Sequence, residues 1–98
     1  MSIEVTARHK DISSRLQDYA RGKAEAIEAE YPKTTSVKVV LDFDRHVYRT
    51  HVTATVNGFQ CDGESDDTDN IVKTIDEATD KVDRQIRKQL DKIGDNRK

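Results

Sequence analysis

The amino-acid sequence predicts a two-layer α+β sandwich with the element order β-α-β-β-β-α, in which two helices cover one face of a four-stranded sheet. Two segments place apolar residues at the spacing of a helix, and four shorter segments alternate apolar and polar residues as strands do. Each strand therefore has one apolar face, and the other face of the sheet is expected to be open to water. The 98 residues, 34% hydrophobic and 37% charged, fit a single domain over residues 1–98 with a thin core.

The N-terminal third of the chain supplies the first strand and the first helix. Alternation in residues 2–7 predicts a strand whose apolar positions are Ile3, Val5 and Ala7. Ser13 and Ser14 are both good helix caps, and Ser14 has a glutamine three residues later, which is the spacing of a capping box. Pro32 is expected to end this helix. Its apolar stripe consists of Leu16, Tyr19, Ala20, Ala24, Ile27 and Tyr31.

Three more alternating segments predict the remaining strands. Their apolar positions are Val37, Val39, Leu41 and Phe43, then Val52, Ala54 and Val56, then Phe59, Cys61, Gly63 and Ser65. Asn57-Gly58, between the last two segments, is a strong signal for a two-residue hairpin. The helical crossover makes the first two strands parallel, and the other pairs are expected to be antiparallel. The last strand has small inward residues, which leave room for a helix to lie close.

The last predicted element is a helix of about 25 residues that begins near Thr68 or Asp69, either of which could cap it. Acidic residues crowd the expected first turn, where the helix dipole favours them. Gly94 is a natural stop. The apolar stripe consists of Ile71, Ile75, Ala78, Val82, Ile86, Leu90 and Ile93.

The net charge of −2 conceals an uneven distribution of charge along the chain. Residues 1–59 carry nine basic and eight acidic side chains (+1), residues 60–83 carry two and nine (−7), and residues 84–98 carry six and two (+4). A protein with an acidic middle and a basic end can bind a polyanion through one surface while its other surfaces are repelled. The distribution is therefore compatible with binding to a nucleic acid.

Several function classes are disfavoured by what the sequence lacks. No apolar run approaches the roughly 20 residues of a membrane span and no signal peptide precedes the first strand, so a cytoplasmic location is expected. Cys61 is the one cysteine and can form no internal disulfide, and the three histidines give no zinc pattern. Without a phosphate-binding loop or a catalytic signature, we expect no enzymatic activity, no cofactor and no metal.

The strongest candidate site is a row of basic residues on the last helix, which we call the basic ridge. It consists of Lys81, Arg84, Lys88 and Lys92, within an arc of about 80° that faces away from the apolar stripe. A solvated helix face explains the basic ridge equally well, because the sequence contains three favourable i,i+4 pairs: Glu77/Lys81, Asp80/Arg84 and Asp83/Arg87. Beyond Arg84, however, the cations outnumber their partners and repeat every four residues, which does not favour folding.

Other polar clusters are weaker candidates. One basic cluster, Arg8, His9 and Lys10, follows the first strand, and another, Arg45, His46 and Arg49, is expected in the connection between the second and third strands. Lys23 borders the apolar stripe of the first helix, where its stem can pack while its ammonium reaches out. The carboxylates of Asp66, Asp67 and Asp69 are better explained by helix capping and solubility than by a metal site.

Two RNA-binding modules have related topologies, and both fit the residues poorly. An RNA-recognition motif stacks bases on aromatic residues of its open sheet face, whereas the open face expected here carries no aromatic residue. A double-stranded-RNA-binding domain has the same α-β-β-β-α order, but we expect it to use basic residues at the start of its second helix. In this sequence that end is acidic, and phosphate would be repelled.

From Ile3 to Ile93 the sequence resembles the ribosome hibernation-promoting factors, also called ribosome-associated inhibitors, ribosomal subunit interface proteins or sigma-54 modulation proteins. The resemblance is carried by Ala7-Arg8-His9, Leu16-Gln17-Asp18-Tyr19 with Lys23, Val39-Val40-Leu41, Val56-Asn57-Gly58, Ile75-Asp76 and the run Asp80-Lys81-Val82-Asp83-Arg84-Gln85-Ile86-Arg87-Lys88. The last run looks like the family's aspartate-lysine-leucine-x-arginine-glutamine-leucine pattern and is the most specific of these motifs.

The resemblance implies a β-α-β-β-β-α fold and binding to the small ribosomal subunit in the channel between its head and body. There the family blocks the mRNA and tRNA positions, so translation stops under stress while the ribosome is protected. The residues that it implies against rRNA phosphates are Lys23, Lys81, Arg84, Arg87, Lys88 and Lys92, joined by Arg8, Arg45 and Arg49. We expect a monomer whose few residues after Ile93 cannot bridge two ribosomes. The alternative is a protein-interaction module that uses its acidic region, before and at the start of the last helix, against a basic partner.

Overall fold

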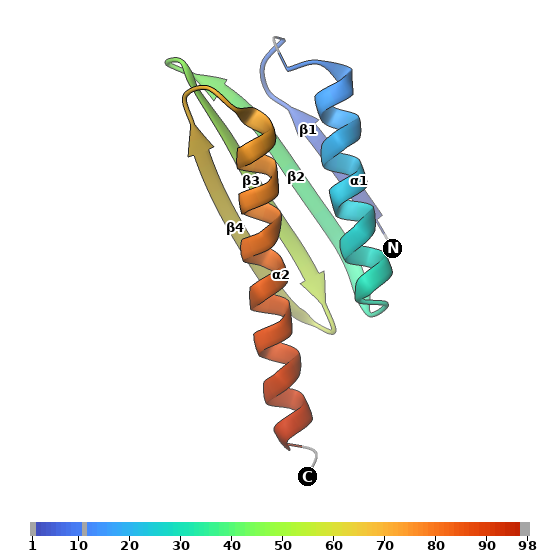
Figure 1. The fold of residues 1–98 in the computed structure, drawn as a ribbon. Helices are drawn as coiled ribbons and strands as arrows, with labels where there is room; N and C mark the ends of the chain where they lie inside the picture. The colour runs from blue at the N-terminus through green and yellow to red at the C-terminus, as the bar shows by residue number, and fades with distance from the viewer. Residues whose placement is uncertain (1, 11, 97–98) are drawn as a thin grey trace.

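The structure is a computed structural model that describes residues 2–10 and 12–96, and for residues 92–96 it describes the backbone alone. Its elements follow the predicted order, as Figure 1 shows. They are β1 (Ser2–Ala7), α1 (Ser14–Glu30), β2 (Thr34–Asp44), β3 (Val47–Val56), β4 (Phe59–Asp67) and α2 (Ile71–Asn96). The predicted α+β sandwich is therefore confirmed.

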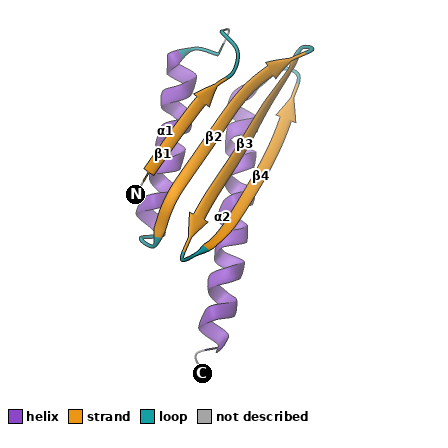
Figure 2. Ribbon diagram, turned by 180° about the vertical axis from the view of Figure 1, so that it is seen from behind, coloured by secondary structure: helices purple, strands orange, loops and turns teal. Residues whose placement is uncertain are grey.

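The four strands form one sheet in the order β1-β2-β3-β4. β1 and β2 are parallel, with Val5 opposite Val39, and the other two pairs are antiparallel, as predicted. Figure 2 shows both helices behind the sheet, on one face only. Within the described part of the chain, no helix has the combined length and apolar character needed to cross a membrane.

The core lies between this face and the helices and consists mostly of the predicted apolar residues. Ile12 of the β1–α1 loop joins them, and Ile93 of the predicted stripe lies outside the described side chains. The fully buried strand residues include Val37, Val39, Leu41, Val52 and Ala54, and the fully buried helix residues include Ala20, Ala24, Ile75, Val82 and Ile86. Buried hydroxyl groups also enter this core, because the Thr50 and Thr74 Oγ1 atoms lie 2.9 Å apart in a hydrogen bond. Every buried side-chain polar atom among the described residues has a partner.

The start of α1 differs from the predicted capping box. Ser13 is the N-cap, and its Oγ accepts a hydrogen bond from the Leu16 backbone N–H at 3.3 Å. Gln17 does not reach back to Ser14 as a capping box requires, because its amide donates instead to the Ile12 carbonyl at 3.5 Å. Tyr19, assigned to the apolar stripe, is 37% exposed and lies at its edge.

The two hairpins contain tight turns of two residues each. Asn57 and Gly58 have φ angles of 52° and 86°, which confirms the predicted turn between β3 and β4. The turn between β2 and β3 consists of Arg45 and His46 alone. Arg49 was expected in this connection, but it lies inside β3 because the strand pairing continues to Val47.

β4 and α2 approach closely at Gly63, as the small inward residues of β4 predict. A Cβ atom built on Gly63 would lie 2.6 Å from the Ala78 carbonyl oxygen and 2.8 Å from Lys81 Cβ. Side chains of α2 also cover the exposed edge of this strand. The Gln85 amide donates to the Asp62 carbonyl at 2.6 Å and accepts from the Asp62 backbone N–H at 3.1 Å.

Both predicted ends of α2 were wrong. The helix begins at Ile71 and not near Thr68, because Asn70 is the cap: its side-chain oxygen accepts from the Lys73 backbone N–H at 3.1 Å. The carboxylates expected in the first turn precede the helix, and that turn contains no acidic residue. The helix continues through Gly94 to Asn96, since a glycine ends a helix only where its backbone turns left-handed, and Gly94 keeps the helical conformation.

Candidate nucleic-acid interface

The basic ridge lies on the outer face of α2, opposite the buried stripe of Ile75, Val82 and Ile86. Lys81, Arg84 and Lys88 are all exposed. Lys92 belongs to the same helix, but its side chain lies outside the described residues. The helical period that predicted the ridge is thus realised in the fold, at least over its first two turns.

Lys81 is held by β4 and not by the glutamate one turn before it. Its Nζ donates to the Glu64 carbonyl oxygen at 2.7 Å, while Glu77 accepts a hydrogen bond from Ser65 Oγ at 2.6 Å. The predicted Glu77/Lys81 pair is therefore wrong. The close approach at Gly63 explains this, because it brings the Lys81 stem against the strand.

Arg84 forms the predicted pair with Asp80, with 2.8 Å between Nη2 and Oδ2. Its side chain is 77% exposed, so water screens this pair and a phosphate can compete for the guanidinium. For Lys88 we find no salt bridge to any described residue. The ridge therefore offers one weakly paired guanidinium and one available ammonium, four residues apart.

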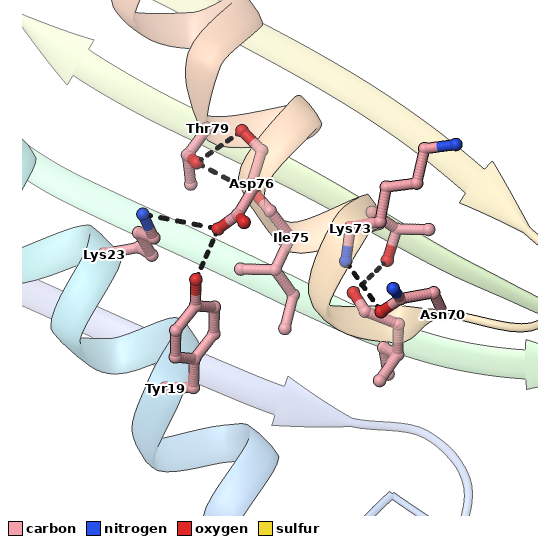
Figure 3. Close-up of polar contacts among 9 residues, drawn as sticks. Tyr19, Lys23, Asn70, Lys73, Ile75, Asp76 and Thr79 are labelled. Atoms are coloured by element: carbon pink, nitrogen blue, oxygen red, sulfur yellow. Dashed lines mark hydrogen bonds and ion pairs between the residues drawn. The ribbon is translucent and has the colours of Figure 1, made fainter.

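On the flank of α2 that faces α1, a tyrosine, a lysine and an aspartate form the first of two polar clusters (Figure 3). The Tyr19 hydroxyl donates to Asp76 Oδ1 at 2.6 Å, and Lys23 Nζ lies 3.3 Å from the same oxygen. The hydrogen bond to Asp76 raises the pKa of Tyr19, and the hydrogen bond between Lys23 and Asp76 raises the pKa of Lys23. The ammonium of Lys23 is thus committed to a carboxylate and also lies 5.5 Å from the centre of the Tyr19 ring.

The second cluster joins the end of α1 to the middle of α2. The buried Tyr31 hydroxyl donates to Asp83 Oδ1 at 2.7 Å and accepts from Arg87 Nε at 3.1 Å. Arg87 also pairs with Glu30 and with Asp83, each at 3.1 Å, so the predicted Asp83/Arg87 pair is confirmed. The Nε and Nη2 atoms of Arg87 both contact other side chains of this protein. Arg87 therefore links α1 to α2, and we call this set of contacts the clamp.

Replacing Tyr31 by phenylalanine is expected to lower the free energy of unfolding by about 2 kcal/mol, because both hydrogen-bonding groups of the clamp lose a partner. Burial, followed by the hydrogen bond to Asp83, raises the pKa of Tyr31 to about 12. A proton held more tightly in the folded chain stabilises the fold below pH 10, and that contribution is lost as the pH rises toward 12.

Urea unfolding at pH 8 and at pH 11 checks both statements. The difference in stability between the wild type and Tyr31→Phe is expected to shrink at the higher pH. Tyr19→Phe is the matched control, since it also removes a hydroxyl bonded to an aspartate, but at an exposed site. An equal loss in both variants would contradict the clamp.

The remaining sequence candidates lie on the opposite side of the sheet from the ridge. Arg8 and Arg49 line a shallow depression of the open face together with Val40, Asp42, His51 and Glu64, and Arg45 lines another at the hairpin. Arg49 Nη2 lies 3.7 Å from Asp66 Oδ2 and pairs in register with Asp42 on its other side. The fold therefore does not bring these three arginines to the ridge.

The open face is predominantly acidic, in contrast to the outer face of α2. Strand alternation places on it the side chains of Glu4, Lys38, Asp42, Asp44, Arg49, Asp62, Glu64 and Asp66. Phosphate groups would be repelled by six carboxylates against two cations of the strands. Residues 71–91 of α2 carry five basic and five acidic side chains, so the helix differs from the open face by its local row of cations and not by a net positive charge. That row would orient the protein on a polyanion.

Asp67 and Asp69, next to the start of α2, stabilise the local chain. The Asp67 carboxylate accepts a hydrogen bond from the Asp69 backbone N–H at 3.1 Å and lies 3.5 Å from Lys73 Nζ. The backbone hydrogen bond from Asp69 lowers the pKa of Asp67. These contacts are those of a loop that leads into a helix.

Comparison with known proteins gives consistent matches over nearly the whole chain. The model of the family described as Sigma 54 modulation protein / S30EA ribosomal protein matches residues 3–94. A ribosome hibernation promoting factor of Pseudomonas putida is 25% identical over 92 residues, covering 94% of this chain and 89% of the relative.

Two solved structures share the fold. A ribosomal subunit interface protein from Coxiella burnetii superposes with a TM-score of 0.79 at 18% identity, covering 92% of this chain and 98% of that one. The N-terminal domain of Thermus thermophilus Protein Y superposes with a TM-score of 0.74 at 24% identity, covering 90% and 98%.

Proposed function

This chain belongs to the Sigma 54 modulation protein / S30EA ribosomal protein family, and on that premise we propose that it is a ribosome hibernation factor without enzymatic activity. It binds rRNA of the small subunit in the channel between head and body, where it blocks mRNA and tRNA and stops translation under stress. The observation that carries this proposal is the basic ridge on the exposed outer face of α2.

Two surfaces follow from the geometry of the proposed rRNA-binding residues. Lys81, Arg84 and Lys88 share one helix face and form the primary contact with phosphates, together with Lys92 of the same helix. Lys23 and Arg87 flank it and reach RNA only by exchanging their carboxylate partners. Arg8, Arg45 and Arg49 lie on the far side and make separate contacts at the edge of the bound protein.

Co-sedimentation of the purified protein with purified small subunits, measured from 50 to 200 mM salt, tests the proposal. Four to six phosphate contacts predict that log K falls with log salt with a slope of about −3 to −5. Cell-free translation is expected to stop once the protein saturates the ribosomes. Binding that does not depend on salt, or translation that continues at saturation, would contradict the proposal.

A second candidate function rests on the acidic open face. Asp62, Glu64 and Asp66 point to the same side of the edge strand β4, and a basic protein could bind there. Capture of a basic protein without ribosomes, together with a flat salt dependence of ribosome binding, would favour this protein-interaction function over rRNA binding.

Replacing Asp80 by asparagine is expected to increase the affinity for small subunits about two- to fivefold. The change removes the carboxylate that lies 2.8 Å from the Arg84 guanidinium and competes with phosphate for it. Glu4→Gln is the control, because it removes one negative charge from the open face. Equal gains in both variants would mean that net charge alone, and not the release of Arg84, controls binding.

A further inference from the structure

The turn between β2 and β3 holds two bulky residues in a backbone conformation that suits glycine. Arg45 and His46 have φ angles of 53° and 66°, in the left-handed region. Type I′ turns favour Asn-Gly at these positions, and the other hairpin of this chain has that sequence at Asn57-Gly58. Backbone strain of this kind is concentrated at functional sites, which suggests that the side chains of this turn have a function.

Next to this turn, rings from three segments gather around Phe43. Its ring centre lies 5.3 Å from that of His9, 6.4 Å from that of His46 and 4.5 Å from that of Tyr48. His9 comes from the β1–α1 loop, which lies at the same end of the molecule as the hairpin (Figure 1). Phe43 and Tyr48 are half-buried, whereas His46 is exposed. The cluster therefore presents the exposed ring of His46 next to the half-buried ring of Phe43.

The charges around the turn separate its two sides. Asp42 and Asp44 lie with Arg45 on the side of the open face. The rings lie on the other side, which is the side of the sheet that carries the helices, because Phe43 packs against the core. A phosphate is disfavoured near these two carboxylates. On the ring side, Asp67 lies opposite Tyr48 in the strand register, and its carboxylate is paired with Lys73.

We propose that this ring cluster binds an unpaired base of RNA, which stacks on His46. Aromatic and imidazole side chains stack with bases of any identity, because every base has a π face. The inference rests on the proposed function in taking RNA as the ligand. It adds a second contact at the hairpin, and that contact recognises a base where the ridge recognises phosphates.

The test compares the binding of two fluorescent probes at low salt. One is an oligoadenylate of ten nucleotides, and the other is a sugar–phosphate chain of the same length that carries no bases. The wild type is expected to bind the oligoadenylate about tenfold more tightly. In Arg45→Asn/His46→Gly this preference should disappear, while the Tm rises by about 4 °C or more because the turn is relieved of strain. His46→Phe keeps a ring and should retain the preference. Lys33→Asn, which removes a charge at the opposite end of the sheet, should leave the preference unchanged.

The outcomes separate this inference from the proposed function. A wild type that binds both probes equally, or a variant Arg45→Asn/His46→Gly that retains the preference for bases, would overturn the base-binding site. A wild type that prefers bases but does not sediment with small subunits would support the base-binding site and overturn the ribosomal function. A higher Tm with unchanged preference would show that the strained turn has no role in binding RNA.

Discussion

Replacing Gly63 by alanine is expected to lower the free energy of unfolding by about 3 kcal/mol and the Tm by about 15 °C. The new Cβ would lie 2.6 Å from the Ala78 carbonyl oxygen, 2.8 Å from Lys81 Cβ and 3.3 Å from Val82 Cγ2. A backbone oxygen cannot rotate away as the end of a side chain can, so α2 must move off β4. That movement would open the packing of buried side chains such as Val82 and loosen the Lys81 hydrogen bond to Glu64.

The same substitution at Gly22 gives the control, because no atom lies within 4 Å of a Cβ at that position in α1. Alanine is favoured over glycine inside a helix by about 1 kcal/mol, so Gly22→Ala is expected to stabilise the protein. Urea unfolding followed by circular dichroism measures both variants. A Gly63→Ala variant as stable as Gly22→Ala would show that α2 and β4 are not in close contact.

The strands were predictable because burial on one face imposes an alternation that the sequence must display. Val37, Val39 and Leu41 are fully buried as the pattern requires, and the helical stripe of α2 is equally direct. The helix ends were less predictable, because Thr68, Asp69 and Asn70 can all accept the same cap hydrogen bond. Which of them caps the helix depends on where β4 ends, and β4 ends at Asp67 because its pairing with β3 extends to that residue.

The candidate site was predictable only where it lies within one element. The spacing of Arg84 and Lys88 alone places them on one helix face. The bond from Tyr31 to Asp83 joins residues that are 52 positions apart, and no local pattern signals it. The position of Arg49 on the open face was also missed, because an expected loop turned out to be a strand, and alternation then fixed the side of the sheet.

Charge reversal on the ridge is expected to have the largest effect on binding. In Arg84→Glu/Lys88→Glu the affinity for small subunits should fall at least about 100-fold, since each reversal replaces an attraction to phosphate by a repulsion of about 1.4 kcal/mol or more. Both side chains are exposed and neither packs in the core, so the far-UV circular dichroism spectrum should be unchanged. Co-sedimentation at fixed salt measures the effect, and the salt slope should become less steep by about 0.7–0.9 for each lost contact.

The matched control for this variant is Lys33→Glu/Lys38→Glu, which changes the net charge by the same amount. Lys38 lies on the acidic open face, 4.0 Å from Glu4, and Lys33 lies in the turn between α1 and β2. If binding depends on the ridge, this control should lose affinity only through the long-range field, which salt screens within about 10 Å at 0.1 M. If both variants lose the same affinity, net charge and not the outer face of α2 determines binding. If neither variant loses affinity, the ridge is a solvated helix face, and the acidic open face becomes the surface to test next.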